Sequence, residues 1–127
     1  MIKAIKARKM PRFTRGLAPG VYRAKIHSVK LNEGEVTNRG VRDVVYITFI
    51  LDDGRTIVQR YFFYLASHTQ LGQVTDALMG PIDEGEEVDL TDLIGMECRI
   101  TVEIRTSANG TGWINVVGVE PFEIDSF

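Results

Sequence analysis

The chain has 127 residues, of which 44% are hydrophobic and 25% are charged. This length suits one domain with its own core, and the composition argues against a disordered chain. No apolar run approaches the ~20 residues that a membrane helix needs, and no apolar segment follows the basic N-terminus as in a secretion signal. The single cysteine, Cys98, excludes an intrachain disulfide, so we expect a cytoplasmic protein with no membrane partner.

The net charge of −2 conceals an uneven distribution of charge. Residues 1–16 contain six basic residues and no acidic one, whereas the rest of the chain contains the other nine basic residues and all seventeen acidic ones. Six of the acidic residues lie in the stretch DEGEEVDLTD, residues 83–92. A polyanionic partner stays compatible with this balance, because local patches of charge decide such binding.

The beginning of the chain predicts an arm, a strand and a loop. Residues 1–19, where prolines and glycines follow the basic run, are expected to form a basic N-terminal arm. Apolar and charged residues alternate over 20–31, which is typical of a half-buried strand. The alternation slips at Val29, as a bulge or a strong bend would require. Residues 32–42, NEGEVTNRGVR, are expected to form a loop.

A hairpin and a helix are predicted next. The apolar stretches 44–51 and 56–65 read as two strands joined by a turn at Asp52-Asp53-Gly54. Ser67 is expected to cap a helix, with Gln70 completing a capping box. The apolar face of this helix consists of Leu71, Val74 and Leu78. Gly80 and Pro81 are expected to end it.

The last third of the chain predicts a short helical turn at 90–94 and two further strands. The strands span 97–106 and 113–122, on either side of the turn SANGTG. Residues 123–127 are expected to form a short acidic tail that ends in phenylalanine.

The order of three strands, one helix and two strands predicts the fold class. It is the order of an all-β domain with one helix, a five-stranded OB-fold-like Greek-key barrel with the helix between strands 3 and 4, over residues 20–122. A five-stranded sandwich or another small barrel is the alternative.

The turn at Gly54 decides which side chains face the core. A three-residue loop with a left-handed Gly54 pairs Leu51 with Arg55 and keeps Arg60 out of the core, where an unpaired guanidinium would be costly. Expected to point inward are Val45, Ile47, Phe49, Leu51, Ile57, Gln59, Tyr61, Phe63, Leu65, Ile114 and Val116. Expected to point outward are Val44, Tyr46, Thr48, Ile50, Val58, Arg60, Phe62, Tyr64, Trp113, Asn115 and Val117. The inward position of Gln59 counts against this register.

Aromatic and basic side chains gather on the predicted outer face. Aromatic rings stack bases at ~1–3 kcal/mol per base, and arginines hold phosphates. The expected nucleic-acid-binding residues are Tyr46, Arg60, Phe62, Trp113, Arg99, Arg105, Arg39, Arg42 and Lys25. Alternatively, Tyr46 and Phe62 pack under the arm or a partner subunit, Trp113 covers the barrel mouth, and each arginine is merely solvated.

The five-strand pattern followed by an acidic end with a terminal phenylalanine resembles single-stranded DNA-binding proteins of bacteria and phages. The resemblance implies that Glu123, Asp125 and Phe127 recruit replication and repair partners. The stretches GVYRAKIHSVKL, DDGRTIV and VDLTDLIGMECRITVE also resemble small phage and mobile-element proteins of replication and recombination modules. This likeness implies a nucleic-acid role in a bacterial host cytoplasm.

Both ends of the chain leave an alternative open. Phe122 and Phe127 could pack on the barrel as a structural strap, because an ordered terminus is usually tied down by packing. The basic arm could bind phosphates or lie over the acidic stretch 83–92, within or between subunits.

No enzyme signature is present. His27 and His68 lack metal-ligand spacing with Cys98, and no phosphate-binding glycine loop occurs. We therefore expect no catalysis, cofactor or metal. Three functions compete: sequence-tolerant binding of single-stranded DNA, a protein-interaction or phage-assembly module without nucleic-acid affinity, and a barrel that binds oligosaccharides. A homo-oligomer is compatible with each of them.

Overall fold

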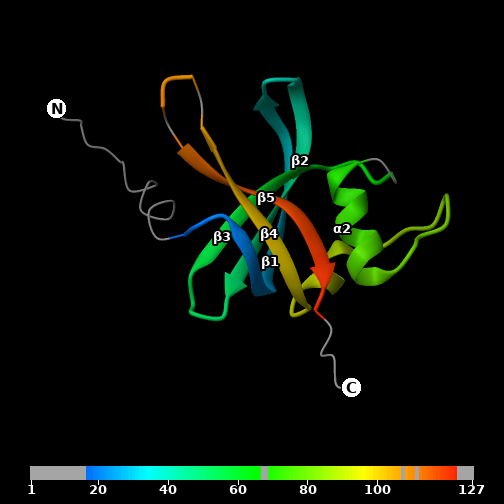
Figure 1. Cartoon of the computed structure of the whole chain (residues 1–127). Helices are drawn as coiled ribbons and strands as arrows, with labels where there is room; N and C mark the ends of the chain where they lie inside the picture. Colours follow the sequence, from blue (N-terminus) through cyan, green and yellow to red (C-terminus); the bar gives the residue numbers. More distant parts are fainter. Residues whose placement is uncertain (1–16, 67–68, 107, 111, 123–127) are drawn as a thin grey trace, which may run out of the picture.

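The computed structural model describes residues 17–66, 69–106, 108–110 and 112–122. Its elements are β1 (Gly20–Thr37), β2 (Gly40–Leu51), β3 (Thr56–Phe62), α2 (Gln70–Met79), the 3-10 helix η1 (Leu90–Leu93), β4 (Glu97–Thr106) and β5 (Gly112–Pro121). The strands form one antiparallel sheet in the order β3-β2-β1-β4-β5, which curls into a barrel-like shape (Figure 1). This confirms the predicted fold class, with the helix between strands 3 and 4.

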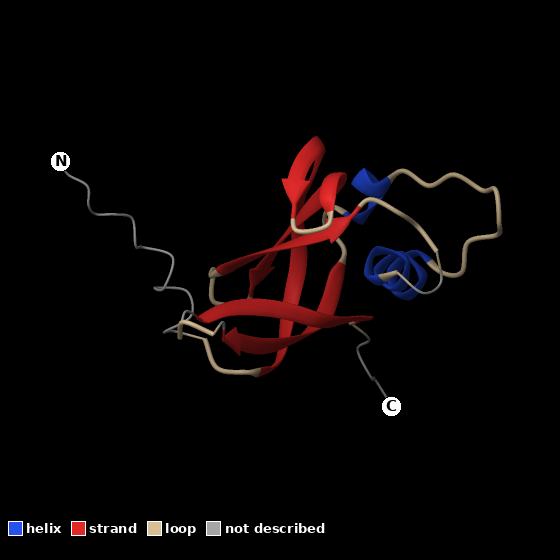
Figure 2. Cartoon of the chain, turned by 90° about the horizontal axis from the view of Figure 1, so that it is seen from above, coloured by secondary structure: helices blue, strands red, loops and turns tan. Residues whose placement is uncertain are grey.

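The sheet does not close by a backbone ladder, because β3 and β5 are its two edges. The side-chain amide of Gln59 on β3 spans the gap between them. It accepts a hydrogen bond from the backbone N–H of Val116 at 2.8 Å and donates one to the Asn115 side chain at 3.1 Å. Helix α2 packs against both edge strands, and Figure 2 shows it beside the open ring of strands. The inward Gln59 is thus the residue that joins the edges.

The first hairpin is longer than its sequence indicates. The bulge near Val29 is confirmed, because the β1–β2 register shifts between Ile26 and Ser28. The predicted loop at 32–42 is wrong: β1 continues to Thr37 and β2 starts at Gly40. A second register shift, next to the left-handed Gly34 (φ 71°), lets the strand continue past its glycine. The residues look like a loop because most of them are exposed on both faces of the ribbon.

The second hairpin has the predicted geometry. Gly54 is left-handed (φ 92°), and the Leu51 N–H donates to the Arg55 carbonyl at 2.8 Å. As predicted, six of the inward side chains of this hairpin are buried: Val45, Ile47, Phe49, Leu51, Ile57 and Tyr61. Val44, expected on the outer face, is also buried; it lies on β2 between β1 and β3, where its cross-strand neighbours are Asn32 and Phe62.

The third strand ends earlier than predicted. The Tyr64 N–H donates to the Phe62 carbonyl, which forms a tight turn that takes the chain off the sheet. The prediction that Phe63 and Leu65 face the core is therefore wrong, because strand alternation stops at Phe62. Phe63 is 44% exposed and Leu65 is 37% exposed.

The helix begins at a different cap from the one expected. Thr69 is the N-cap, and its side chain accepts a hydrogen bond from the Gly72 N–H at 3.0 Å; Ser67 lies outside the described residues. The same hydroxyl bonds the Ala66 backbone, and a Cβ at Gly72 would stand 1.9 Å from the Ala66 carbonyl oxygen. Glycine is thus required where the segment before the helix crosses its first turn. The apolar face and the Gly80 stop are as predicted, with Leu71 and Val74 buried.

Candidate nucleic-acid interface

A basic cleft lies between the β1–β2 hairpin and the start of α2. Its volume is about 740 Å³. It is lined by Arg39, Arg42, Asp43, Phe62, Phe63, Tyr64, Thr69, Gln70 and Leu71. It thus brings together three predicted site residues, Arg39, Arg42 and Phe62, and adds Tyr64, which the sequence places on the outer face but not in a site.

The turn of the first hairpin positions Arg39. The Thr37 hydroxyl donates to the Gly40 carbonyl at 2.7 Å and accepts from the Arg39 N–H at 3.0 Å. The Arg39 guanidinium then lies 5.7 Å from the centre of the Phe62 ring. Arg60 approaches the same ring at 5.8 Å. A ring flanked by two guanidiniums is a platform that can stack a base.

The arginines of the described surface differ in whether a carboxylate pairs with them. Four of the seven described arginines are in ion pairs with carboxylates: Arg23, Arg55, Arg60 and Arg105. Within the part of the chain that the structure describes, the other three, Arg39, Arg42 and Arg99, have no carboxylate at ion-pair distance, and two of these three line the cleft. The one carboxylate of the cleft, Asp43, accepts the Gly34 N–H at 2.9 Å. The cleft therefore offers two guanidiniums to an incoming anion.

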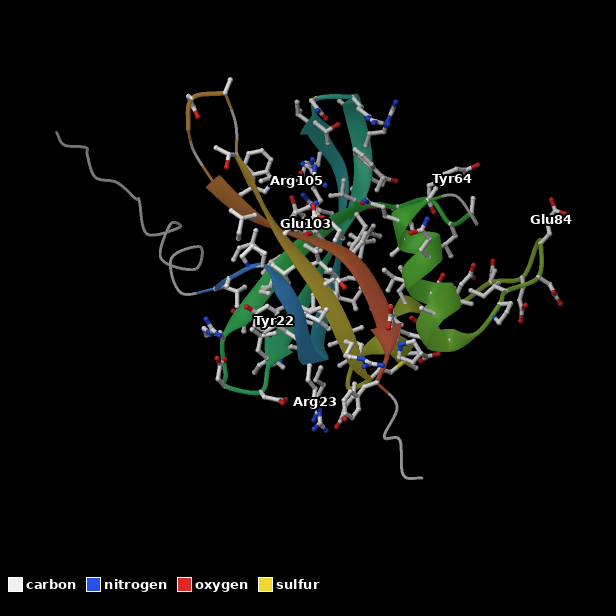
Figure 3. The ribbon with its side chains drawn as sticks, viewed as in Figure 1. Tyr22, Arg23, Tyr64, Glu84, Glu103 and Arg105 are labelled. Atoms are coloured by element: carbon white, nitrogen blue, oxygen red, sulfur yellow. The ribbon has the colours of Figure 1, made fainter. Side chains whose placement is uncertain are left out.

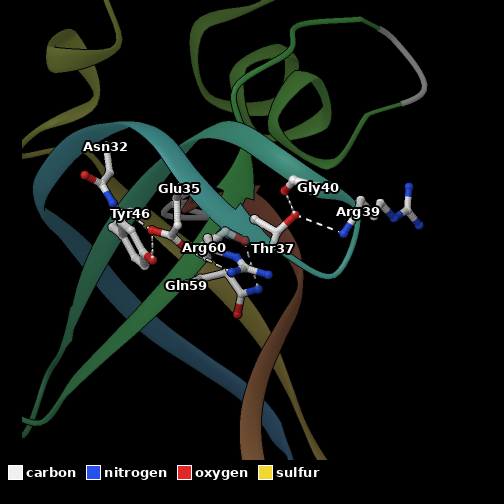
Figure 4. A network of polar contacts seen from close by, with 8 residues as sticks. All are labelled: Asn32, Glu35, Thr37, Arg39, Gly40, Tyr46, Gln59 and Arg60. Carbon is white, nitrogen blue, oxygen red and sulfur yellow. Dashed lines mark hydrogen bonds and ion pairs between the residues drawn. The ribbon is translucent and has the colours of Figure 1, made fainter.

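Glu35 joins two predicted site residues in one network (Figure 4). It accepts from the Tyr46 hydroxyl at 2.6 Å, from the Arg60 guanidinium at 3.0 Å and from the Asn32 amide at 2.7 Å. The Tyr46 bond, followed by those of Asn32 and Arg60, holds the pKa of Glu35 below its usual value. The same bond raises the pKa of Tyr46. Sequence reasoning missed Glu35 because it placed the residue in a loop.

Trp113 and Arg105 form a second part of the predicted face, on the β4–β5 hairpin. They are direct cross-strand partners, Trp113 is 47% exposed, and Arg105 pairs with Glu103 at 3.3 Å. Both hairpins project from the same end of the barrel (Figure 1). The Gln59–Asn115 bond, two residues from Trp113, ties this strand to the strand that carries Arg60.

The structure does not bring Arg99 and Lys25 to this end. Their cross-strand partners are Arg23 and Glu97, near the other end of the barrel, and Figure 3 shows Arg23 far from Arg105. There the Arg23 guanidinium is 2.9 Å from Glu97 and 4.2 Å from the Phe122 ring centre. The tail residues Glu123, Asp125 and Phe127 and the arm residues 1–16 lie outside the described residues.

The segment that follows β3 also lines a second hollow, an apolar groove with acidic residues in its lining. Its volume is about 760 Å³. It is lined by Val29, Leu31, Val45, Phe63, Leu65, Glu86, Glu87, Val88, Asp89, Leu90 and Thr91. The exposed Leu31, Phe63 and Leu65 form its apolar part. Sequence reasoning missed it, because Phe63 and Leu65 were assigned to the core.

The described residues contain no cluster of histidine, cysteine, aspartate or glutamate side chains that could hold a metal ion. Cys98 is buried on β4, and burial raises the pKa of its thiol to about 11. In the same part of the chain, no helix is both long and apolar enough to cross a membrane.

The chain matches no protein-family model and no curated protein at a significant level.

Proposed function

We propose that the protein binds single-stranded DNA with little regard to sequence. The observation that carries the proposal is the basic cleft, where Arg39 and Arg42 lack described carboxylate partners and stand beside the Phe62 ring. Phosphate binding needs cations that are not already neutralised, and base binding needs accessible aromatic faces. The cleft combines both.

In this proposal the phosphate contacts and the base-stacking contacts lie side by side in the cleft. Arg39 and Arg42 contact phosphates, while Phe62 and Tyr64 stack bases. Trp113 extends the path onto the β4–β5 hairpin, which projects from the same end of the barrel. Every base has a stacking face, so such contacts tolerate sequence. The loop regions of an OB-fold that carry these residues are those that commonly bind oligonucleotides.

The wider role follows from the sequence resemblance. We infer a part in replication or recombination encoded by a phage or mobile element, carried out in a bacterial host cytoplasm. Glu123, Asp125 and Phe127 are the proposed contacts for replication or recombination proteins.

A fluorescence titration with oligo-dT tests the proposal. Trp113 is the only tryptophan, so its emission reports one place on the site. We expect quenching that saturates and that weakens as salt is raised, because each phosphate contact contributes a slope of about −0.7 to log K against log salt. An oligosaccharide ligand would show no such salt dependence. A folded protein that binds no oligonucleotide at low salt would refute the proposal.

The apolar groove favours a second candidate, a protein-interaction module. Its exposed leucines and Phe63 lie under a rim that includes Glu86, Glu87 and Asp89. Charge complementarity selects a partner segment in which apolar residues are flanked by lysine or arginine. Large contiguous apolar patches on a protein surface often mark sites of protein interaction.

A labelled peptide, Lys-Leu-Lys-Ala-Leu-Lys, tests this second candidate. It is expected to bind the full chain, and binding is expected to be lost in a Glu86→Lys/Glu87→Lys variant. The same peptide with glutamates in place of lysines is the control and is not expected to bind. Equal binding of both peptides, or of the peptide to both proteins, would exclude the groove as the site.

A further inference from the structure

We propose that Glu35 keeps Arg60 out of phosphate binding, so that Arg60 and Tyr46 present a neutral surface to bases while the cleft arginines alone hold phosphates. The inference rests on the proposed binding of single-stranded DNA and divides its site into two parts. In this inference Glu35 determines which arginines contact phosphates.

The geometry of Glu35 is that of an occupied anion site. Its carboxylate accepts hydrogen bonds from three side chains on three strands: Asn32 on β1, Tyr46 on β2 and Arg60 on β3. The Glu35 side chain is only 18% exposed, whereas Arg60 is 40% exposed. The oxygens that a phosphate would offer to Arg60 and Tyr46 are thus already supplied by the protein.

Arg39 in the cleft and Arg60 beside Glu35 differ in ion pairing although both lie near Phe62. Arg39 and Arg60 lie at nearly equal distances from the Phe62 ring, 5.7 and 5.8 Å. Arg60 has a carboxylate at 3.0 Å, and Arg39 has none at ion-pair distance among the described residues. A phosphate that approached Arg60 would meet the charge of Glu35, whereas one that approached Arg39 would not.

The two arginines should therefore differ in their effect on salt dependence. Counterions are released only where protein cations neutralise phosphates, and each such contact contributes about 0.7 to the slope for single strands. Arg60 paired with Glu35 contributes nothing to the slope of the native protein. Without the Glu35 charge, Arg60 becomes available and adds one contact.

The test measures the affinity for oligo-dT over a range of salt for three variants and the native protein. Glu35→Gln keeps the acceptor oxygen and removes the charge, and it is expected to bind more tightly at low salt with a slope steeper by about 0.7. Glu35→Gln/Arg60→Gln is expected to return to the native slope. Glu33→Gln, which removes an exposed charge from the same strand, is the matched control and is expected to leave the slope unchanged.

The outcomes separate this inference from the proposed function. Binding with the same slope in the native protein and in Glu35→Gln would overturn the inference and leave the function standing, as would equal steepening by Glu33→Gln. No binding by any variant would overturn both. Titration of the tyrosines checks the network without DNA, because loss of the Glu35 charge should lower the pKa of Tyr46. An unchanged tyrosine titration would show that the network does not form, and would also overturn the inference.

Discussion

The basic cleft and the apolar groove share one short segment and differ in charge. Residues 62–64 line the cleft beside Arg39 and Arg42, and Phe63 and Leu65 line the groove beneath Glu86 and Glu87. Both hollows have aromatic or aliphatic surface and similar volumes, about 740 and 760 Å³. Hydrophobicity alone therefore does not separate their partners. We propose that the sign of the surrounding charge does, because a basic hollow attracts a polyanion and an acidic one attracts a basic segment.

The turn at the end of β3 makes this division possible. Had the strand continued past Phe62, alternation would have sent Phe63 and Leu65 into the core. The Tyr64–Phe62 backbone bond ends the alternation, and the close packing at Gly72 places the segment against the helix. One stretch of chain thereby contributes apolar surface to two sites.

The sharpest way to break the comparison is a pair of substitutions, one in each hollow. Phe62→Leu removes a stacking face from the cleft, which is worth ~1–3 kcal/mol or roughly 5- to 150-fold in affinity for oligo-dT. Leu65→Ala, which removes apolar surface from the groove and not from the cleft, is expected to change that affinity by no more than about twofold, a difference below ~0.5 kcal/mol. A fluorescence titration measures both. Equal losses would mean that DNA does not distinguish the two hollows.

A second prediction concerns the seam that holds the Trp113 strand beside β3. Gln59→Leu leaves the buried N–H of Val116 without its acceptor, which should lower the free energy of unfolding by ~1–3 kcal/mol. Urea denaturation measures this loss. Thr48→Val, on the neighbouring strand, is the control and should have a smaller effect. An unchanged stability in Gln59→Leu would show that the amide does not join the edges of the sheet.

The third prediction compares free and paired arginines. Arg39→Gln/Arg42→Gln removes two phosphate contacts, so the slope of log K against log salt should become shallower by about 1.4. Between about 50 and about 200 mM salt the variant should lose about sevenfold less affinity than the native protein does. Arg55→Gln removes a guanidinium that is paired with Asp53 at 2.7 Å, and should leave the slope unchanged. Equal effects of the two changes would contradict the distinction.

The smallest effect is expected in acid. Because the pKa of Glu35 is lowered in the folded state, its stabilising contribution is full above the unfolded value of 4.5 and is lost as pH falls through the lower folded value. The native protein should therefore lose slightly more stability than Glu35→Gln as pH falls from above 4.5 into that range. Thermal unfolding of the two proteins over this pH range measures the difference. A constant difference between them would contradict the lowered pKa.

The sequence was informative where local rules decide the structure. The order of elements, the three-residue turn at Gly54 and the apolar face of α2 follow from turn chemistry and periodicity. The hairpin at 32–42 was mispredicted because a ribbon exposed on both faces has no apolar alternation to identify it. The role of Glu35 is hidden for the same reason, because nothing local shows that it faces Tyr46 and Arg60 on neighbouring strands.

The candidate site was predictable in part. Tyr46, Arg60 and Phe62 were placed on one face because cross-strand register follows from the turn. The positions of Arg99 and Lys25 along the barrel depend on the long-range register of β1 with β4, which no local pattern in the sequence indicates. Ion pairing, which distinguishes Arg39 from Arg60, depends on side chains from separate strands and is not visible in any local pattern.

The most direct test of the central claim is an NMR titration of the full chain with oligo-dT, followed through backbone amide shifts. We predict that the perturbed amides cluster at residues 39–43, 60–64 and 113, around the basic cleft and Trp113. Shifts that instead cluster at 29–31 and 86–91, or no shifts at low salt, would contradict the assignment of the cleft to nucleic acid.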